Sequence, residues 1–240
     1  MQGRGHRTLL LAVITALIGV PVAHARIAAQ APTIPKREEA VSIERYLLGR
    51  VVPKIGARGS VHLWTNTGYS NRRAVYPVIA HKTLKNGSEW LKVRVVRRPR
   101  DVDTWIPAWA TRKVWIAWHV VVDTSSRTMR IYHSGKLYRR YKVVVGASYT
   151  PTPTGHYYIV DHMRLFNAWA HGQWALATSA YSAKLKHFDG GNGVIALHAR
   201  ASLTAPVGTA ASHGCVRLND WAAAWMAKHI PNGTRIDVQR

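Results

Sequence analysis

The stretch SHGCVRL, residues 212 to 218, contains the only cysteine of the 240-residue chain, Cys215. His213 precedes the cysteine by two positions and Arg217 follows it by two. In an extended backbone the side chains at i, i+2 and i+4 project to one side, while the alternate residues turn toward the core. The spacing therefore predicts a positively charged face around the sulfur.

A thiol attacks as the thiolate, and a free cysteine with a pKa near 8.5 is only a few per cent ionised at neutral pH. Lowering that pKa by about two units takes roughly 2.7 kcal/mol, which a nearby imidazolium can supply. His198 follows the apolar run GVIAL, which fits a buried strand, and it lies 17 residues before Cys215. A connection of that length lets two neighbouring segments bring imidazole and sulfur together. We expect the backbone N–H groups of Gly214 and Cys215 to face a substrate carbonyl, as an oxyanion site requires.

Other uses of a single thiol stay open at this point. The count excludes an intramolecular disulfide, and it leaves a buried apolar cysteine, an intermolecular bridge or a reactive thiol. Zinc is a further alternative, because His198, His213 and Cys215 could supply three ligands. Against zinc, the chain has no second cysteine and no H-x-x-x-H pair suited to a metal.

The first 25 residues have the pattern of a secretory signal. Arg4 and Arg7 precede an apolar stretch from Leu9 to Val20, and the small-residue pattern Ala23 to Ala25 follows. The apolar stretch of 12 residues is shorter than a membrane span. We predict a cleaved signal, no stable membrane insertion after cleavage, and an exported protein of the periplasm or cell wall. An uncleaved anchor is the alternative.

The charge balance indicates anionic surroundings. Lysine and arginine number 34 against 11 acidic residues, which gives a formal net charge of +23. No helix-turn-helix, zinc-finger or RNA-binding signature accompanies this charge, so we predict no nucleic-acid partner. An exported chain meets anionic wall polymers, lipids and peptide carboxylates first, and a basic surface that serves only solubility is the alternative.

The chain divides into segments of different character. Residues 26–40 are predicted to be a linker, and residues 41–113 contain short β-type runs separated by turn signals. This second segment resembles a bacterial SH3-like domain through G-x-x-W-L-K-V at Gly87 to Val93 and W-I-P-A at Trp105 to Ala108. The resemblance implies a small barrel that binds or positions the protein on the wall, with a purely structural role as the alternative.

Residues 114–240 predict a second, mainly β unit. Two hairpins come first, and the proline-rich TPTPTG at Thr150 to Gly155 is expected to be a loop or a sheet edge. Near the end, Asn219 or Asp220 can cap a helix over WAAAWMAKHI, and TRIDV closes the chain as a strand.

At the cysteine, this second unit resembles the catalytic domain of the L,D-transpeptidase (YkuD) family. The family pattern is a histidine, a variable loop and then S/T-H-G-C-x-R/N, and it is met by His198 followed by residues 212 to 217. TPTG at Thr152 to Gly155 and Gly146 match two further places in the family pattern. One departure is Ala199, where many members have glycine. Since the family uses the carbonyl of that residue to orient the imidazole, alanine should serve.

The resemblance implies a β-rich sandwich with a C-terminal helix, Cys215 as nucleophile and His198 as general base. It implies attack on a peptidoglycan stem peptide, loss of D-alanine, and transfer of the thioester acyl group to an amine, without metal or other cofactor. An aromatic segment around Trp169 and Trp174 is the expected cover against water. The remaining predicted site residues are His213 and Gly214 as support, and Ser212 and Arg217 as substrate contacts.

Two rival functions remain. A hydrolase, either a carboxypeptidase or an endopeptidase, would use the same nucleophile with water as acceptor. A non-catalytic wall-binding protein would instead depend on the basic SH3-like segment.

Overall fold

The computed structural model describes residues 33–166, 173–187, 191–201 and 203–240. Within it, Thr33–Arg240 forms one compact unit. The predicted signal and most of the predicted linker lie outside the described residues. The strand β1, Glu38–Ile43, begins inside the segment predicted as a linker.

The first half of the described chain forms a seven-stranded sheet in the order β3-β2-β6-β5-β4-β1-β7. Its neighbouring strands run antiparallel, and a short 3-10 helix, η1 at Ala108–Ala110, separates β6 from β7. Side chains alternate along β5, because Leu91, Val93 and Val95 are buried and the basic residues between them are not. The strands besides β1 are β2 Leu47–Arg50, β3 Gly59–Leu63, β4 Tyr76–Thr83, β5 Glu89–Val95, β6 Val102–Pro107 and β7 Thr111–Ile116.

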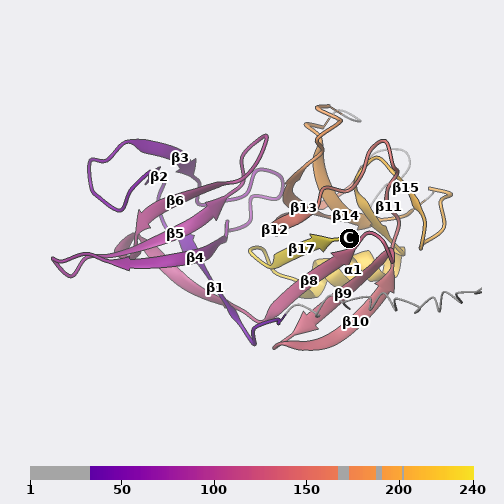
Figure 1. The fold of residues 1–240 in the computed structure, drawn as a ribbon, viewed down its shortest axis with the longest axis horizontal. Coiled ribbons are helices and arrows are strands. Elements are labelled where there is room, and N and C mark those ends of the chain that lie inside the picture. Colours follow the sequence, from indigo (N-terminus) through magenta and orange to yellow (C-terminus); the bar gives the residue numbers. More distant parts are fainter. Residues whose placement is uncertain (1–32, 167–172, 188–190, 202) are drawn as a thin grey trace, which may run out of the picture. The chain divides into compact units, whose positions relative to one another are not determined.

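The second half forms an eight-stranded sheet in the order β10-β9-β8-β17-β12-β13-β14-β16, with a two-stranded pair β11-β15 beside it. Figure 1 shows helix α1 lying against this part of the chain. The predicted fold class, mainly β with one C-terminal helix, is confirmed. The strands are β8 Trp118–Asp123, β9 Thr128–His133, β10 Lys136–Lys142, β11 Val145–Gly146, β12 Gly155–Arg164, β13 Trp174–Tyr181, β14 Val194–Ala199, β15 Ala210–Ser212, β16 Val216–Leu218 and β17 Arg235–Gln239.

Helix α1, Asp220–His229, covers the core of the second sheet. Asn219 is its N-cap, and the helix ends at the Ile230 cap just before Pro231, which cannot continue it. Small side chains let the helix approach the sheet closely, since Ala222 and Ala223 are fully buried. Met226 joins them in a core shared with β8, β9, β14 and β16, which is separate from the core of the first sheet.

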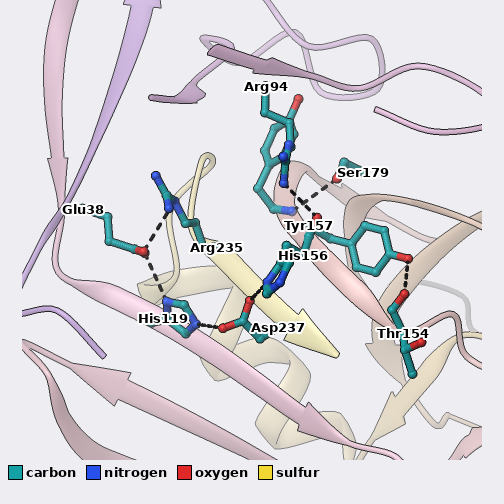
Figure 2. Close-up of polar contacts among 10 residues, drawn as sticks. Glu38, Arg94, His119, Thr154, His156, Tyr157, Ser179, Arg235 and Asp237 are labelled. Carbon is teal, nitrogen blue, oxygen red and sulfur yellow. Dashed lines mark hydrogen bonds and ion pairs between the residues drawn. The ribbon is translucent and has the colours of Figure 1, made fainter. Parts of the chain in front are cut away.

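A chain of ion pairs centred on the buried His119 joins β1 to the second sheet (Figure 2). His119 on β8 lies between Glu38, 3.2 Å from Nδ1, and Asp237, 2.9 Å from Nε2. Asp237 also accepts from His156 at 2.6 Å, and Arg235 lies 3.4 Å from Glu38. Burial alone would lower the pKa of His119, but the hydrogen bonds to Asp237 and Glu38 outweigh it and raise the pKa to about 9.

The free energy of unfolding should therefore fall from neutral to alkaline pH, because His119 loses its proton over that range. A pKa raised from about 6.5 to about 9 contributes stability that is fully present below pH 6.5 and is lost as the pH rises through 9. Over that window the free energy of unfolding should fall by on the order of 3 kcal/mol more in the parent than in His119→Gln. Urea unfolding at pH 6 and pH 9.5 measures this difference.

The matched control is His81→Gln, because His81 makes a solvent-exposed pair with Glu39 at 3.0 Å. Exposed pairs contribute little, so this variant should keep the parental pH dependence. Identical pH dependence in the parent and His119→Gln would contradict the proposed role of this chain of ion pairs.

Candidate active site

The pairing of two short strands places His198 beside Cys215. Strands β14 and β16 run parallel, with Leu197 opposite Val216 and His198 opposite Arg217. Cys215 immediately precedes β16, and the backbone N–H of Ala196 on β14 points at its sulfur, 3.5 Å from Sγ. His198 and Cys215 both line one cavity of about 590 Å³. The sequence prediction that these residues meet is consistent with this geometry.

The imidazole of His198 is held in one orientation. Its Nδ1 lies 2.7 Å from the carbonyl oxygen of Ala199, and because a carbonyl only accepts, Nδ1 must be the protonated nitrogen. Nε2 is then the nitrogen that can take up a proton. Alanine thus provides the orienting carbonyl at the position where glycine is common.

Burial disfavours the charged forms of this pair. It lowers the pKa of His198 to about 4, and the positive charge of Arg217 acts in the same direction. Burial raises the pKa of the Cys215 thiol, opposed by the Ala196 N–H and the Arg217 charge. These directions favour a neutral thiol and a neutral imidazole in the resting site. The expected imidazolium beside a thiolate gains no support from them, because desolvation disfavours both charged forms, and it stays a prediction.

The residues around the sulfur do not form one continuous strand. β15 ends at Ser212, and Gly214 has a φ of +119°, a conformation that residues with a Cβ rarely adopt. The chain bends there before β16 begins. His213, Cys215 and Arg217 nevertheless line the same cavity, although the continuous extended backbone from which their common face was predicted is interrupted at Gly214.

Ser212 braces this bend from inside. Only 1% of the residue is exposed, and its hydroxyl donates to the carbonyl of Cys215 at 2.6 Å while accepting the N–H of Gly214 at 3.1 Å. The structure thus makes Ser212 a positioning residue, in place of the predicted substrate contact. The amide of Gly214 is already engaged, which leaves the Cys215 amide as the predicted oxyanion donor.

The proline-rich loop supports the bend from the other side. Thr152 Oγ1 accepts the N–H of Gly146 at 2.9 Å and donates to the carbonyl of Gly214 at 2.8 Å. Thr150 Oγ1 donates to the carbonyl of Ser212 at 3.0 Å. A Cβ on Gly146 would lie 2.3 Å from the Thr150 carbonyl oxygen, so only glycine fits there. These contacts explain why TPTG and Gly146 accompany the cysteine motif.

A loop of the first sheet reaches the cavity, which sequence reasoning missed. Tyr69, between β3 and β4, lines the cavity with Cys215 and His198. The N–H groups of Tyr69 and Ser70 each donate to Asp161 Oδ2 at 2.9 Å, and the Ser70 hydroxyl donates to the same carboxylate. Burial would raise the pKa of Asp161, but the hydrogen bonds from Ser70 keep it below the usual value. No local sequence signal links residues so far apart in the chain.

The predicted aromatic cover is centred on Trp169 and Trp174, and Trp169 lies outside the described residues. Trp174 is the first residue of β13, where it packs against the core and lies under the Arg164 guanidinium at 4.3 Å. Trp174 is not among the described residues that line the cavity, and the cover stays a prediction.

The cavity has an apolar wall and one cationic group. Met163, Leu165, Leu185 and Ile195 are among its lining residues. Arg217 also lines it, and its Nε is buried without a hydrogen-bond partner among the described residues. No group of three His, Cys, Asp or Glu side chains suited to a metal ion occurs in the described ranges, so the zinc alternative lacks a ligand set there.

Comparison with known proteins identifies the family of the second, catalytic-domain half of the chain. Residues 117–238 match the family profile of the YkuD L,D-transpeptidase catalytic domain. A curated relative, the putative L,D-transpeptidase YkuD of Bacillus subtilis, is 27% identical over 125 residues, which cover 52% of this chain and 68% of the relative. The chain therefore belongs to the YkuD L,D-transpeptidase catalytic domain family. The profile begins at residue 117, and the SH3-like resemblance of the preceding segment stays a prediction.

Solved structures are more distant. An L,D-transpeptidase from Mycobacterium tuberculosis is 15% identical, with a TM-score of 0.46, and the match covers 83% of this chain and 98% of that one. A mutant L,D-transpeptidase of Enterococcus faecium is 18% identical with a TM-score of 0.39, and the match covers 51% of this chain and 49% of that one. The present chain thus spans about half the length of that second structure.

Replacing Thr152 should loosen the cysteine loop. Thr152→Val leaves the Gly146 N–H and the Gly214 carbonyl without their shared partner, which should cost about 1–3 kcal/mol in the free energy of unfolding. Thr154→Val is the matched control, because Thr154 is exposed and only its backbone carbonyl is bonded, by Tyr157. Urea unfolding of both variants tests this, and equal losses would contradict the bracing role.

Alkylation can report the charge state of the thiol, because Cys215 is the only cysteine in the chain. The rate with iodoacetamide should rise with pH along a curve displaced to higher pH than that of the same chain in denaturant, since burial raises the thiol pKa. A rate that is already maximal near pH 6 in the folded protein would instead show a resting thiolate.

Proposed function

We propose that the chain is an exported peptidoglycan L,D-transpeptidase in which Cys215 is the nucleophile and His198 the general base. The observation that carries the proposal is the parallel pairing of β14 with β16, which brings both side chains to one cavity. Family membership and the orientation of the imidazole by Ala199 support it.

The first half of the reaction is acyl transfer to sulfur. His198 Nε2 takes the thiol proton while Sγ attacks the carbonyl carbon between the third stem residue and the terminal D-alanine. Because burial favours the neutral forms of both groups, proton transfer accompanies the attack and does not precede it. The C–N bond then breaks, the departing nitrogen takes the proton from His198, and a thioester remains on Cys215.

The second half regenerates the thiol. An amine of a second stem peptide attacks the thioester carbon, His198 accepts the proton that the amine loses, and the C–S bond breaks. The sulfur leaves with that proton, and a new amide cross-links the two stems. The cleaved amide supplies the energy for the new one, so no nucleotide is consumed.

Three surrounding groups assist these steps. The Cys215 amide is the donor assigned to the developing oxyanion, since the Gly214 amide is engaged with Ser212. Arg217 is assigned to a substrate carboxylate, because its guanidinium faces the cavity with a buried, unpaired Nε. His213, exposed at the cavity, supports the site beside the sulfur.

The apolar wall favours transfer over hydrolysis. Water competes with the amine for the thioester, and side chains such as Leu165 and Ile195 reduce the number of water molecules that the cavity can order. A carboxypeptidase or endopeptidase would share every residue named above, so the acceptor must be determined by experiment.

The proposed location is the periplasm or cell wall, in keeping with the signal pattern of residues 1–25. Among the described residues, no helix has the length and apolar character needed to cross a bilayer. The proposed partners are peptidoglycan stem peptides, with anionic wall polymers as further contacts of the basic surface, and no nucleic acid.

Mass spectrometry of a disaccharide-tetrapeptide incubated with the protein tests the reaction. Transfer predicts a cross-linked dimer and free D-alanine, whereas hydrolysis predicts tripeptide and D-alanine without a dimer. Cys215→Ala should abolish both products, and a thioester adduct on Cys215 should be trapped when no amine acceptor is added. Unchanged products with Cys215→Ala would overturn the proposal, because the chemistry would then not depend on the thiol. Absence of any product with the parent would favour a non-catalytic wall-binding protein.

A further inference from the structure

A second hollow lies at the edge of the catalytic sheet, outside the site described above. Strand β10 and the first turn of α1 enclose about 340 Å³, which we call the basic pocket. Its lining includes Arg139, Arg140, Tyr141, Lys142 and Trp221. β10 is an end strand of the sheet, so this face of the pocket is not covered by a further strand.

The cations of the pocket, Arg139, Arg140 and Lys142, form no ion pair with an acidic side chain of the described residues. Lys142 makes only a 3.4 Å contact with the carbonyl of Ser126. The neighbouring carboxylate of Asp220 accepts the N–H of Ala201 at 2.8 Å.

The N-terminus of α1 adds to the positive potential at the basic pocket. Asn219, the N-cap of α1, makes no side-chain capping hydrogen bond, so the first turn presents the positive end of the helix dipole to the pocket.

Arg139 Nε at the pocket wall is buried and has no hydrogen-bond partner in the described residues, and the Arg139 side chain neighbours the Tyr141 hydroxyl. Arg139 is held in place by aromatic rings, with its guanidinium carbon 4.4 Å from the ring centre of Trp225 and 5.5 Å from that of Tyr138. A preformed guanidinium with an unpaired N–H suits a ligand that brings acceptor oxygens.

An exposed indole completes the pocket. Trp221 is 60% exposed and meets Tyr141 edge-on, with ring centres 5.4 Å apart. Its open face is a flat apolar surface on which the C–H face of a sugar ring can pack. A ligand with both acidic groups and sugar rings would use all of these features together.

We propose that the basic pocket binds a carboxylate-bearing glycan, namely stretches of the wall sugar strand whose N-acetylmuramic acid residues carry no stem peptide. In these residues the lactyl carboxylate is free, whereas in residues that carry a stem it is bound as an amide. The inference rests on the proposed function for the source of the glycan. The loop after β14 runs from one site to the other, because Leu203 lines the catalytic cavity and Val207 lines the basic pocket. A strand held through a peptide-free residue would present the stem peptides of neighbouring residues to the catalytic half of the protein.

Cations on an end strand also hinder edge-to-edge pairing of sheets, which is a competing reason for their presence. That role requires charge along β10 but neither a concave pocket nor an exposed indole. Trp221 therefore separates the two explanations.

Calorimetric titration of the full chain tests the proposal. The probe is a peptide-free oligosaccharide of alternating N-acetylglucosamine and N-acetylmuramic acid, compared with a neutral chitin oligosaccharide of equal length and with poly(glycerol phosphate). Trp221→Ala should weaken binding of the acidic glycan about tenfold, equivalent to the loss of about 1.4 kcal/mol. Replacing Arg139, Arg140 and Lys142 by Gln together should abolish its salt dependence.

The matched control variants remove an exposed indole or three exposed cations from the first-sheet half, away from the basic pocket. Trp109→Ala deletes an indole that is 73% exposed on η1, and a triple Gln variant of the exposed Arg58, Lys82 and Lys85 removes three cations from the first-sheet half. Both controls should retain parental affinity. An equal loss of affinity in the control triple variant would mean that binding follows net charge and not the pocket. Equal binding of the neutral glycan, or stronger binding of the phosphate polymer, would overturn the proposed ligand. Absence of acidic-glycan binding would overturn it as well.

Release of D-alanine from a soluble tetrapeptide separates this proposal from the proposed function. The pocket variants should leave that release unchanged, because none of their residues lines the catalytic cavity. If the parent releases no D-alanine yet binds the glycan through Trp221, the proposed function fails and the pocket stands. If the parent releases D-alanine but shows no such binding, the pocket proposal fails alone.

Discussion

The register between β14 and β16 is the constraint on which the catalytic geometry depends. With His198 opposite Arg217, Cys215 falls next to Ala196, whose N–H reaches the sulfur. Side chains alternate between two faces in a strand, so a slip of one residue would send His198 and Cys215 to opposite sides of the sheet. Leu197 and Val216, buried in the core on the other face, oppose that slip. The alternation that buries Leu197 and Val216 on one face thus also sets His198 and Cys215 on the other.

Burial of this pair has two opposed effects. It lowers the pKa of His198 and raises that of Cys215, which disfavours a resting thiolate. In the proposed reaction, the same exclusion of water would protect a thioester on Cys215 and strengthen the interaction of Arg217 with negative charge that develops in the cavity. Protonation of His198 requires acidic conditions, and the imidazole therefore remains an available base across the neutral range.

Local motifs allowed prediction of the candidate pair, whereas long-range contacts did not follow from the sequence. The spacing around Cys215 and the apolar run before His198 predicted that the two would meet, since alternation and strand ends are local properties. The burial of Ser212 was not predicted, because it depends on the pairing of β15 with β11. Tyr69 was missed because its place at the cavity depends on Asp161, about 90 positions later, and no periodicity records such a contact. The pKa directions of His198 and Cys215 did not follow from the sequence either, because desolvation depends on packing around the whole cavity.

The distribution of the few acidic residues explains the cationic surface. Only 11 acidic residues accompany 34 basic ones, and several of the acidic groups are taken up by contacts that hold chain segments together. Asp161 secures the Tyr69 loop, Glu38 and Asp237 flank His119, and Asp220 fixes the chain after β14. These carboxylates are turned toward backbone, hydroxyl or histidine partners, and Glu38 also pairs with Arg235. Arg217 of the cavity and the cations of β10 form no ion pair among the described residues, so their charge is available to anionic ligands from outside the chain.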